Sequence, residues 1–83
     1  MAKILYFGPL ADLLQKESEQ LPLPADVKTV AALLAHLRKR GADWTLYLSE
    51  DKVQVTINRQ FGNMQQPIQN SDEISLTSLR RRI

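Results

Sequence analysis

The strongest pattern in the chain is a stripe of apolar residues in its middle third. These residues follow the i, i+3, i+4 and i+7 spacing of one helix face, and they are Val30, Leu33, Leu34 and Leu37. Thr29 precedes the stripe and can cap a helix N-terminus, and basic residues fill positions 38–40, where the helix dipole favours cations. The pattern therefore predicts one long helix over residues 29–40, with a single buried face.

Period-two alternation predicts strands in the second half of the chain. Residues 52–57 alternate polar and apolar side chains, and residues 73–77 repeat the alternation. Each of these strands should bury one face and leave the other in water. Residues 58–60 can turn the chain, and Phe61 then opens a short return strand.

The N-terminal third predicts two further strands. Residues 3–7 would place apolar side chains on both faces of a strand, and the pair Gly8-Pro9 would end it. Apolar residues on both faces indicate a strand in the interior of a sheet. Residues 18–23 form a weaker strand, because Pro22 has no backbone donor and is typical of a sheet edge.

Short helical turns are predicted over residues 9–14 and 43–48. Pro9 suits a first helical position, and Trp44, Tyr47 and Leu48 have helical spacing that would close the core. With the strands and the long helix in this order, we expect an α+β fold in which a mixed sheet carries one long helix packed on one face.

The charge distribution predicts a folded domain over residues 1–79 and a basic C-terminal tail over residues 80–83. The chain has 11 basic and 9 acidic residues, a net charge of +2. Without Arg80, Arg81 and Arg82 the body carries eight basic residues against nine acidic ones. A nucleic-acid-binding domain concentrates positive charge on a folded face, so nucleic acid is not an expected partner, although the three arginines could attract a polyanion weakly.

The composition excludes several classes of protein. The 83 residues contain no cysteine, so no disulfide or thiolate chemistry is expected. The sequence has no apolar run of about 18 residues and no signal-like start. These features predict a cytoplasmic protein without a membrane segment.

Candidate catalytic groups are sparse. His36 is the only histidine, and no second member of a triad lies near it, so a half-exposed surface residue is expected. Three carboxylate clusters, Glu17/Glu19, Glu50-Asp51 and Asp72-Glu73, lack a histidine in register and are expected to be solvated rather than metal-bound. No glycine-rich phosphate loop is present. We therefore expect no active site, metal or cofactor, but a binding module or a carrier whose reactive atom is its own terminus.

Four segments in order resemble a known family: KILYFGPLADLL, TVAALLAHLRKRGADW, VTINRQ and PIQNSDEISL. Together they resemble the small subunit of molybdopterin synthase, a sulfur-carrier family with a ubiquitin-like β-grasp fold that is related to the sulfur carrier of the thiamine pathway. The resemblance implies a non-catalytic subunit of a larger enzyme in molybdenum-cofactor biosynthesis.

The resemblance also implies a chemistry for the C-terminus. In that family the tail ends in Gly-Gly, an ATP-dependent activating enzyme adenylates the terminal carboxylate, and sulfur transfer makes a thiocarboxylate. The tail then enters the large subunit and donates sulfur to a pterin precursor. Here the two glycine positions are occupied by Arg82 and Ile83. A second function therefore stays open, that of a β-grasp interaction module without sulfur chemistry.

Partner-binding residues follow from the same resemblance. The apolar docking patch of the family falls on Phe7, Phe61 and Thr77, of which Thr77 replaces an aromatic residue. Arg80 and Arg81 fall on the tail that precedes the glycines. For Phe7, ordinary core packing is an equal alternative, because aromatic residues serve cores and interfaces alike.

Overall fold

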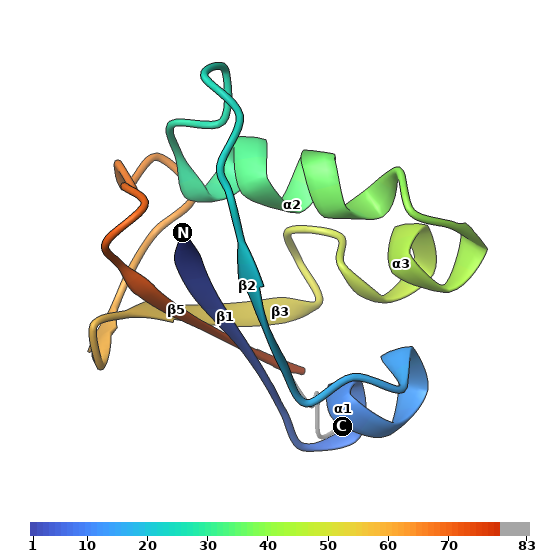
Figure 1. Cartoon of the computed structure of the whole chain (residues 1–83). Coiled ribbons are helices and arrows are strands. Elements are labelled where there is room, and N and C mark those ends of the chain that lie inside the picture. The colour runs from blue at the N-terminus through green and yellow to red at the C-terminus, as the bar shows by residue number, and fades with distance from the viewer. Residues whose placement is uncertain (79–83) are drawn as a thin grey trace.

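A computed structural model describes residues 1–78 of the chain (Figure 1). Within this range the elements are, in order, β1 (Ala2–Phe7), α1 (Pro9–Leu14), β2 (Ser18–Leu21), α2 (Val30–Arg38), α3 (Ala42–Tyr47), β3 (Val53–Ile57), β4 (Gln60–Phe61) and β5 (Glu73–Ser78). The expected boundary between domain and tail, at residue 79, lies outside the described residues.

The five described strands form one mixed sheet in the order β2-β1-β5-β3-β4. Strands β1 and β5 pair in parallel, and the remaining neighbours are antiparallel. The interior position predicted for the first strand is confirmed, and β2 is an edge strand as expected. Strand β2 ends at Leu21 because Pro22 cannot continue the ladder. The expected α+β class with a mixed sheet is confirmed.

Helix α2 crosses one face of the sheet and carries the predicted stripe (Figure 1). All four stripe residues are fully buried. The Thr29 Oγ1 atom accepts a hydrogen bond from the Ala32 N–H at 3.2 Å, which is the predicted cap. The Val30 N–H donates a hydrogen bond to the Gln66 carbonyl, and the Ala31 N–H donates one to the Met64 carbonyl. The first turn of α2 is therefore saturated and leaves no open anion site.

The expectation of one long helix is wrong in detail. Helix α2 has nine residues rather than twelve, because its last bonds tighten to i→i+3 at Lys39 and Arg40. Two six-residue helices, α1 and α3, accompany it, at the positions where helical turns were predicted. They lie together at the end of the sheet where β1 finishes (Figure 1).

One apolar core fills the space between the sheet and the helices. Its buried members come from all three helices or their ends, from β1, β3 and β5, and from two loops; they are Ala2, Ile4, Tyr6, Leu10, Leu14, Val27, Val30, Leu33, Leu34, Leu37, Leu48, Val53, Val55, Ile57, Ile68, Ile74 and Leu76. Trp44 and Tyr47 pack against this core from α3, as the helical spacing predicted. The core accordingly occupies one face of the sheet and leaves the opposite face available.

A charged cluster locks the β1–β2 edge to the end of α2. Arg40 donates two hydrogen bonds to the Glu19 carboxylate, at 2.7 and 2.9 Å, and the Tyr6 hydroxyl donates a third at 2.6 Å. The Arg40 guanidinium lies 4.7 Å from the Trp44 ring centroid, and the Trp44 and Tyr6 rings meet edge to face. Three segments distant in sequence, at residues 6, 19 and 40–44, are thereby held together.

Burial and hydrogen bonding shift the ionisation of this cluster. Burial alone would raise the pKa of Glu19, but the hydrogen bonds from Arg40 and Tyr6 outweigh it and lower that pKa. Burial, followed by the bond to Glu19, raises the pKa of the Tyr6 phenol, so this group stays neutral. The expectation that Glu19 is solvated is wrong, because its side chain is only 13% exposed.

The lowered pKa of Glu19 predicts acid sensitivity. A carboxyl whose pKa falls on folding contributes stability above its unfolded pKa, about 4.3, and loses that contribution as the pH drops through the folded value. Urea unfolding of the wild type should therefore show a steeper loss of stability between about pH 5 and about pH 3 than unfolding of Glu19→Gln. Parallel stability curves for the two proteins over that range would contradict the role of Glu19.

Candidate interaction surface

The face of the sheet opposite α2 is defined by the strand register. Side chains alternate between the two faces of each strand, and the inward set belongs to the core. The register places Phe7, Thr77 and Gln54 in one outward row, and Leu5, Ser75, Thr56 and Phe61 in the next. These seven residues are called the outer face below.

Two aromatic side chains stand out on the outer face. Phe7 is 48% exposed and Phe61 is 77% exposed. The alternative that Phe7 belongs to the core is therefore wrong, because its neighbours Tyr6 and Ile4 take the inward positions of β1. Exposed aromatic rings on a sheet are a feature of protein interfaces.

The two rings share a face without forming one patch. Phe7 lies on β1 and Phe61 on β4, three strands apart, or about 14 Å at the usual strand spacing. Thr77, Ser75 and Thr56 occupy the outward positions between them. The outer face thus has one exposed aromatic ring on β1 and one on β4, and side chains with hydroxyl groups lie on the two strands between them.

The remaining residues expected to bind partners, Arg80 and Arg81, lie outside the described residues, as do Arg82 and Ile83, the expected carrier positions. Strand β5 runs in parallel beside β1 and ends at Ser78, one residue after Thr77. Ser78, the last described residue, therefore lies at the same end of the sheet as Phe7.

The β3–β4 hairpin carries a feature that the sequence pattern did not single out. Asn58 and Arg59 connect the strands and both have positive φ, 52° and 72°. This two-residue connection has the left-handed conformation of a type I′ turn, which favours Asn followed by Gly. The residue pattern predicted a turn at 58–60, but nothing local distinguished Arg59 from an ordinary turn residue.

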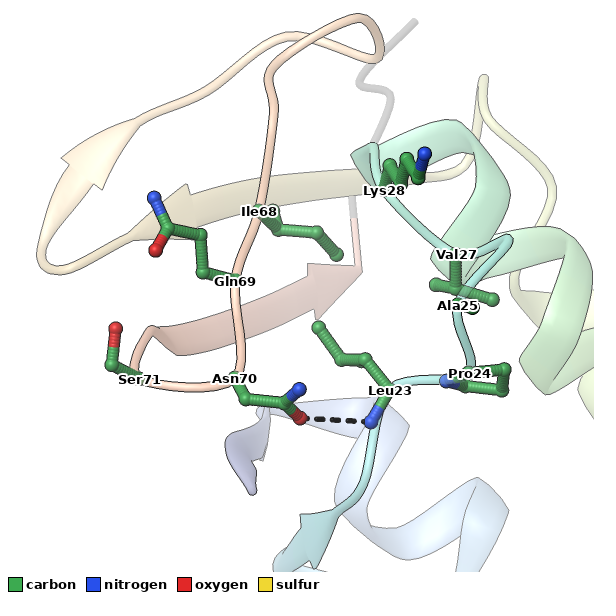
Figure 2. A pocket seen from close by; sticks show the side chains of 9 residues that line it. All are labelled: Leu23, Pro24, Ala25, Val27, Lys28, Ile68, Gln69, Asn70 and Ser71. Carbon is green, nitrogen blue, oxygen red and sulfur yellow. Dashed lines mark hydrogen bonds between the residues drawn. The ribbon is translucent and has the colours of Figure 1, made fainter.

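A shallow pocket of about 520 Å³ lies where the loop after β2 meets the loop before β5 (Figure 2). The Asn70 side-chain oxygen accepts a hydrogen bond from the Leu23 N–H at 2.9 Å and joins the two loops. Lys28 is the one charged residue that lines it. A single lysine beside apolar and amide groups does not provide the convergent acid, base or nucleophile that a catalytic site needs.

Other candidate groups stay apart in the described part of the chain. His36 is half-buried on α2, as expected for a surface histidine. No three His, Cys, Asp or Glu side chains among residues 1–78 are grouped so that they could hold a metal ion. None of the helices found in that range has the length and apolarity to span a bilayer.

Comparison with known proteins identifies the relatives of the chain. Residues 4–77 match the model of the ThiS family. The molybdopterin synthase sulfur carrier subunit of Haemophilus influenzae is 31% identical over 75 residues, which cover 90% of each chain. The subunit of the same name from Escherichia coli is 27% identical over 75 residues, again with 90% of each chain covered.

Solved structures support the same fold. The putative molybdopterin converting factor, subunit 1, from Pyrococcus furiosus superposes with a TM-score of 0.76 at 20% identity, covering 93% of this chain and 94% of that one. At this identity the likeness establishes the ubiquitin-like β-grasp fold alone. Because the family match spans nearly the whole described sheet and core, the chain belongs to the ThiS family and is a homologue of the molybdopterin synthase sulfur carrier subunits.

Proposed function

We propose that this protein acts in molybdenum-cofactor biosynthesis as the small subunit of a molybdopterin synthase. The observation that carries the proposal is the 31% identity to a named sulfur carrier subunit over 90% of both chains. The proposed partners are the large subunit and an ATP-dependent activating enzyme. In this role the protein supplies a docking surface, and the partners supply the catalytic side chains.

The outer face is the proposed docking surface for these partners. Its two aromatic side chains, Phe7 and Phe61, are exposed to solvent and do not belong to the apolar core. Burying such rings against a partner is favourable at about 25 cal/mol per Å² of apolar surface. The end of β5 lies beside Phe7, so a partner that covers Phe7 would also meet Ser78, the last described residue. Because activation consumes ATP, we place the protein in the cytoplasm.

A second function, interaction without sulfur chemistry, is favoured by one specific observation. By the resemblance to the family, its two glycine positions fall on Arg82 and Ile83. Arginine loses much side-chain entropy when threaded into a channel, and a β-branched residue cannot adopt the backbone conformations open to glycine. Partner binding would survive this change, because the outer face does not depend on it.

Binding to the large subunit tests the proposed docking surface. Phe7→Ala and Phe61→Ala should each weaken the Kd roughly tenfold, since truncating an anchoring aromatic residue costs more than about 1 kcal/mol. The measurement is titration calorimetry with the purified large subunit of the same organism. Leu46→Ala is the matched control, because Leu46 is 51% exposed but lies on α3, away from the outer face.

The control separates a docking face from general surface hydrophobicity. We expect Leu46→Ala to bind like the wild type. Equal weakening by all three variants would contradict the assignment of the outer face. Failure of the wild type to bind the large subunit at all would overturn the proposed function.

A further inference from the structure

Arg59 occupies a backbone conformation that its side chain disfavours. Its φ of 72° lies in the left-handed region, where a side chain crowds the backbone and glycine is preferred. It is the second residue of the type I′ turn, a position that glycine fills in most hairpins of this kind. The free energy of unfolding is therefore lower with arginine at this position than it would be with glycine.

Its neighbour Asn58 has a clear structural reason for its own positive φ. The Asn58 N–H donates to the Glu73 carbonyl at 2.7 Å, and the Glu73 N–H donates to the Asn58 side-chain oxygen at 3.0 Å. The Asn58 side-chain nitrogen also donates to the Asp72 carboxylate at 3.0 Å. Three hydrogen bonds thus tie the hairpin to the start of β5 and hold its tip in place.

No comparable contact accounts for Arg59. The residue is exposed, and its guanidinium makes no hydrogen bond or ion pair with any residue in the range 1–78. Asp72, the acidic residue that Asn58 contacts, accepts hydrogen bonds from Asn58 and from the Gln69 N–H. Among residues 1–78, the arginine side chain therefore adds no hydrogen bond or ion pair to the fold.

The position of Arg59 connects it to the outer face. Two residues further on, Phe61 is the most exposed large apolar side chain in the described chain. Strand β4 pairs Phe61 with Thr56, so the ring stands at the border of the outer face next to the hairpin tip. A rigid tip that presents an aromatic ring and an unpaired guanidinium has the composition of an interface hot spot, in which aromatic residues and arginine are enriched.

We propose that Arg59 is a binding residue for the large subunit and pairs with a carboxylate beside the site that receives Phe61. The inference rests on the proposed function and names a specificity-determining contact within it. A guanidinium presents a planar fork of donors that matches a carboxylate, which makes an acidic side chain the fitting partner. Binding outside the domain accounts for an arginine at a position where the backbone favours glycine.

The test exploits opposite effects on stability and on binding. Arg59→Gly should raise the Tm by roughly 4 °C, because it creates the favoured Asn-Gly turn. The same variant should weaken the Kd for the purified large subunit about tenfold, through loss of the charge-assisted hydrogen bonds. Lys39→Ala serves as the matched control, because it removes one positive charge from an exposed site at the end of α2, away from the outer face.

The outcomes separate this inference from the function on which it rests. A more stable Arg59→Gly protein that binds less tightly, with Lys39→Ala unchanged, supports the proposal. Wild-type affinity in Arg59→Gly together with weakened binding by Phe61→Ala overturns the role of Arg59 and keeps the proposed function. Equal weakening by Lys39→Ala shows a general charge effect and also overturns it. A wild type that does not bind the large subunit overturns both.

Discussion

Replacing Arg82 and Ile83 with two glycines is expected to change the 83-residue chain from one that forms no thiocarboxylate into one that does. Glycine lacks Cβ and enters backbone conformations closed to other residues, so a Gly-Gly terminus can present a bare carboxylate inside a narrow site. A guanidinium and a β-branched residue would have to be desolvated, ordered and accommodated there. The measurement is the intact mass after incubation with ATP, a sulfur donor and the activating enzyme, read as exchange of one oxygen for sulfur.

A second tail variant supplies the control for this experiment. Arg80→Gly combined with Arg81→Gly removes positive charge and bulk but keeps Arg82 and Ile83. We expect it to stay unmodified, like the wild type. Efficient thiocarboxylation of the wild type would contradict the prediction and would also exclude the function without sulfur chemistry. No reaction of the Gly-Gly variant would indicate that the body has lost recognition by the activating enzyme.

The second large effect is expected from Ile74→Ala in β5. Ile74 is fully buried on the central strand, and the register places it between Ile4 of β1 and Ile57 of β3. Truncation removes apolar contact and leaves a cavity, at a cost of roughly 2–5 kcal/mol. A domain of this size has roughly 4–12 kcal/mol of stability in total. Urea unfolding should therefore show a midpoint reduced by a large fraction, or a protein already partly unfolded in buffer.

The adjacent residue provides a matched control. Ser75 follows Ile74 on the same strand but points to the outer face. Ser75→Ala should change the free energy of unfolding by no more than about 0.5 kcal/mol, as surface substitutions usually do. A loss for Ser75→Ala as large as that for Ile74→Ala would contradict the assignment of the two faces.

Much of the fold could be predicted from local patterns. The stripe from Val30 to Leu37 specified both the helix and its buried side, because helical periodicity is carried by neighbouring residues. Pro22 likewise indicated an edge strand, since proline lacks a backbone N–H wherever it occurs and this can be read directly from the sequence. The predicted helix was three residues too long. The observed α2 ends at Arg38, because Lys39 and Arg40 form i→i+3 hydrogen bonds next to α3, and the residue pattern does not show that α3 packs there.

The candidate site was less accessible to local reasoning. Strand β1 has apolar residues on both faces, so the pattern left open whether Phe7 belongs to the core. The answer depended on which face α2 covers, and that is a property of the assembled sheet. The strain at Arg59 was hidden for a similar reason, because only the observed hairpin connection requires positive φ at that residue.

The sequence by itself determined the class of the fold, the order of its elements and the family. Each of these depends on residue identity at fixed spacing along the chain. The tertiary structure alone decided that Glu19 pairs with Arg40 across 21 residues, that Phe7 faces outward and that Phe61 lies three strands from it. These features arise from contacts between segments distant in sequence, whose pairing is selected by packing of the whole core rather than by any local preference.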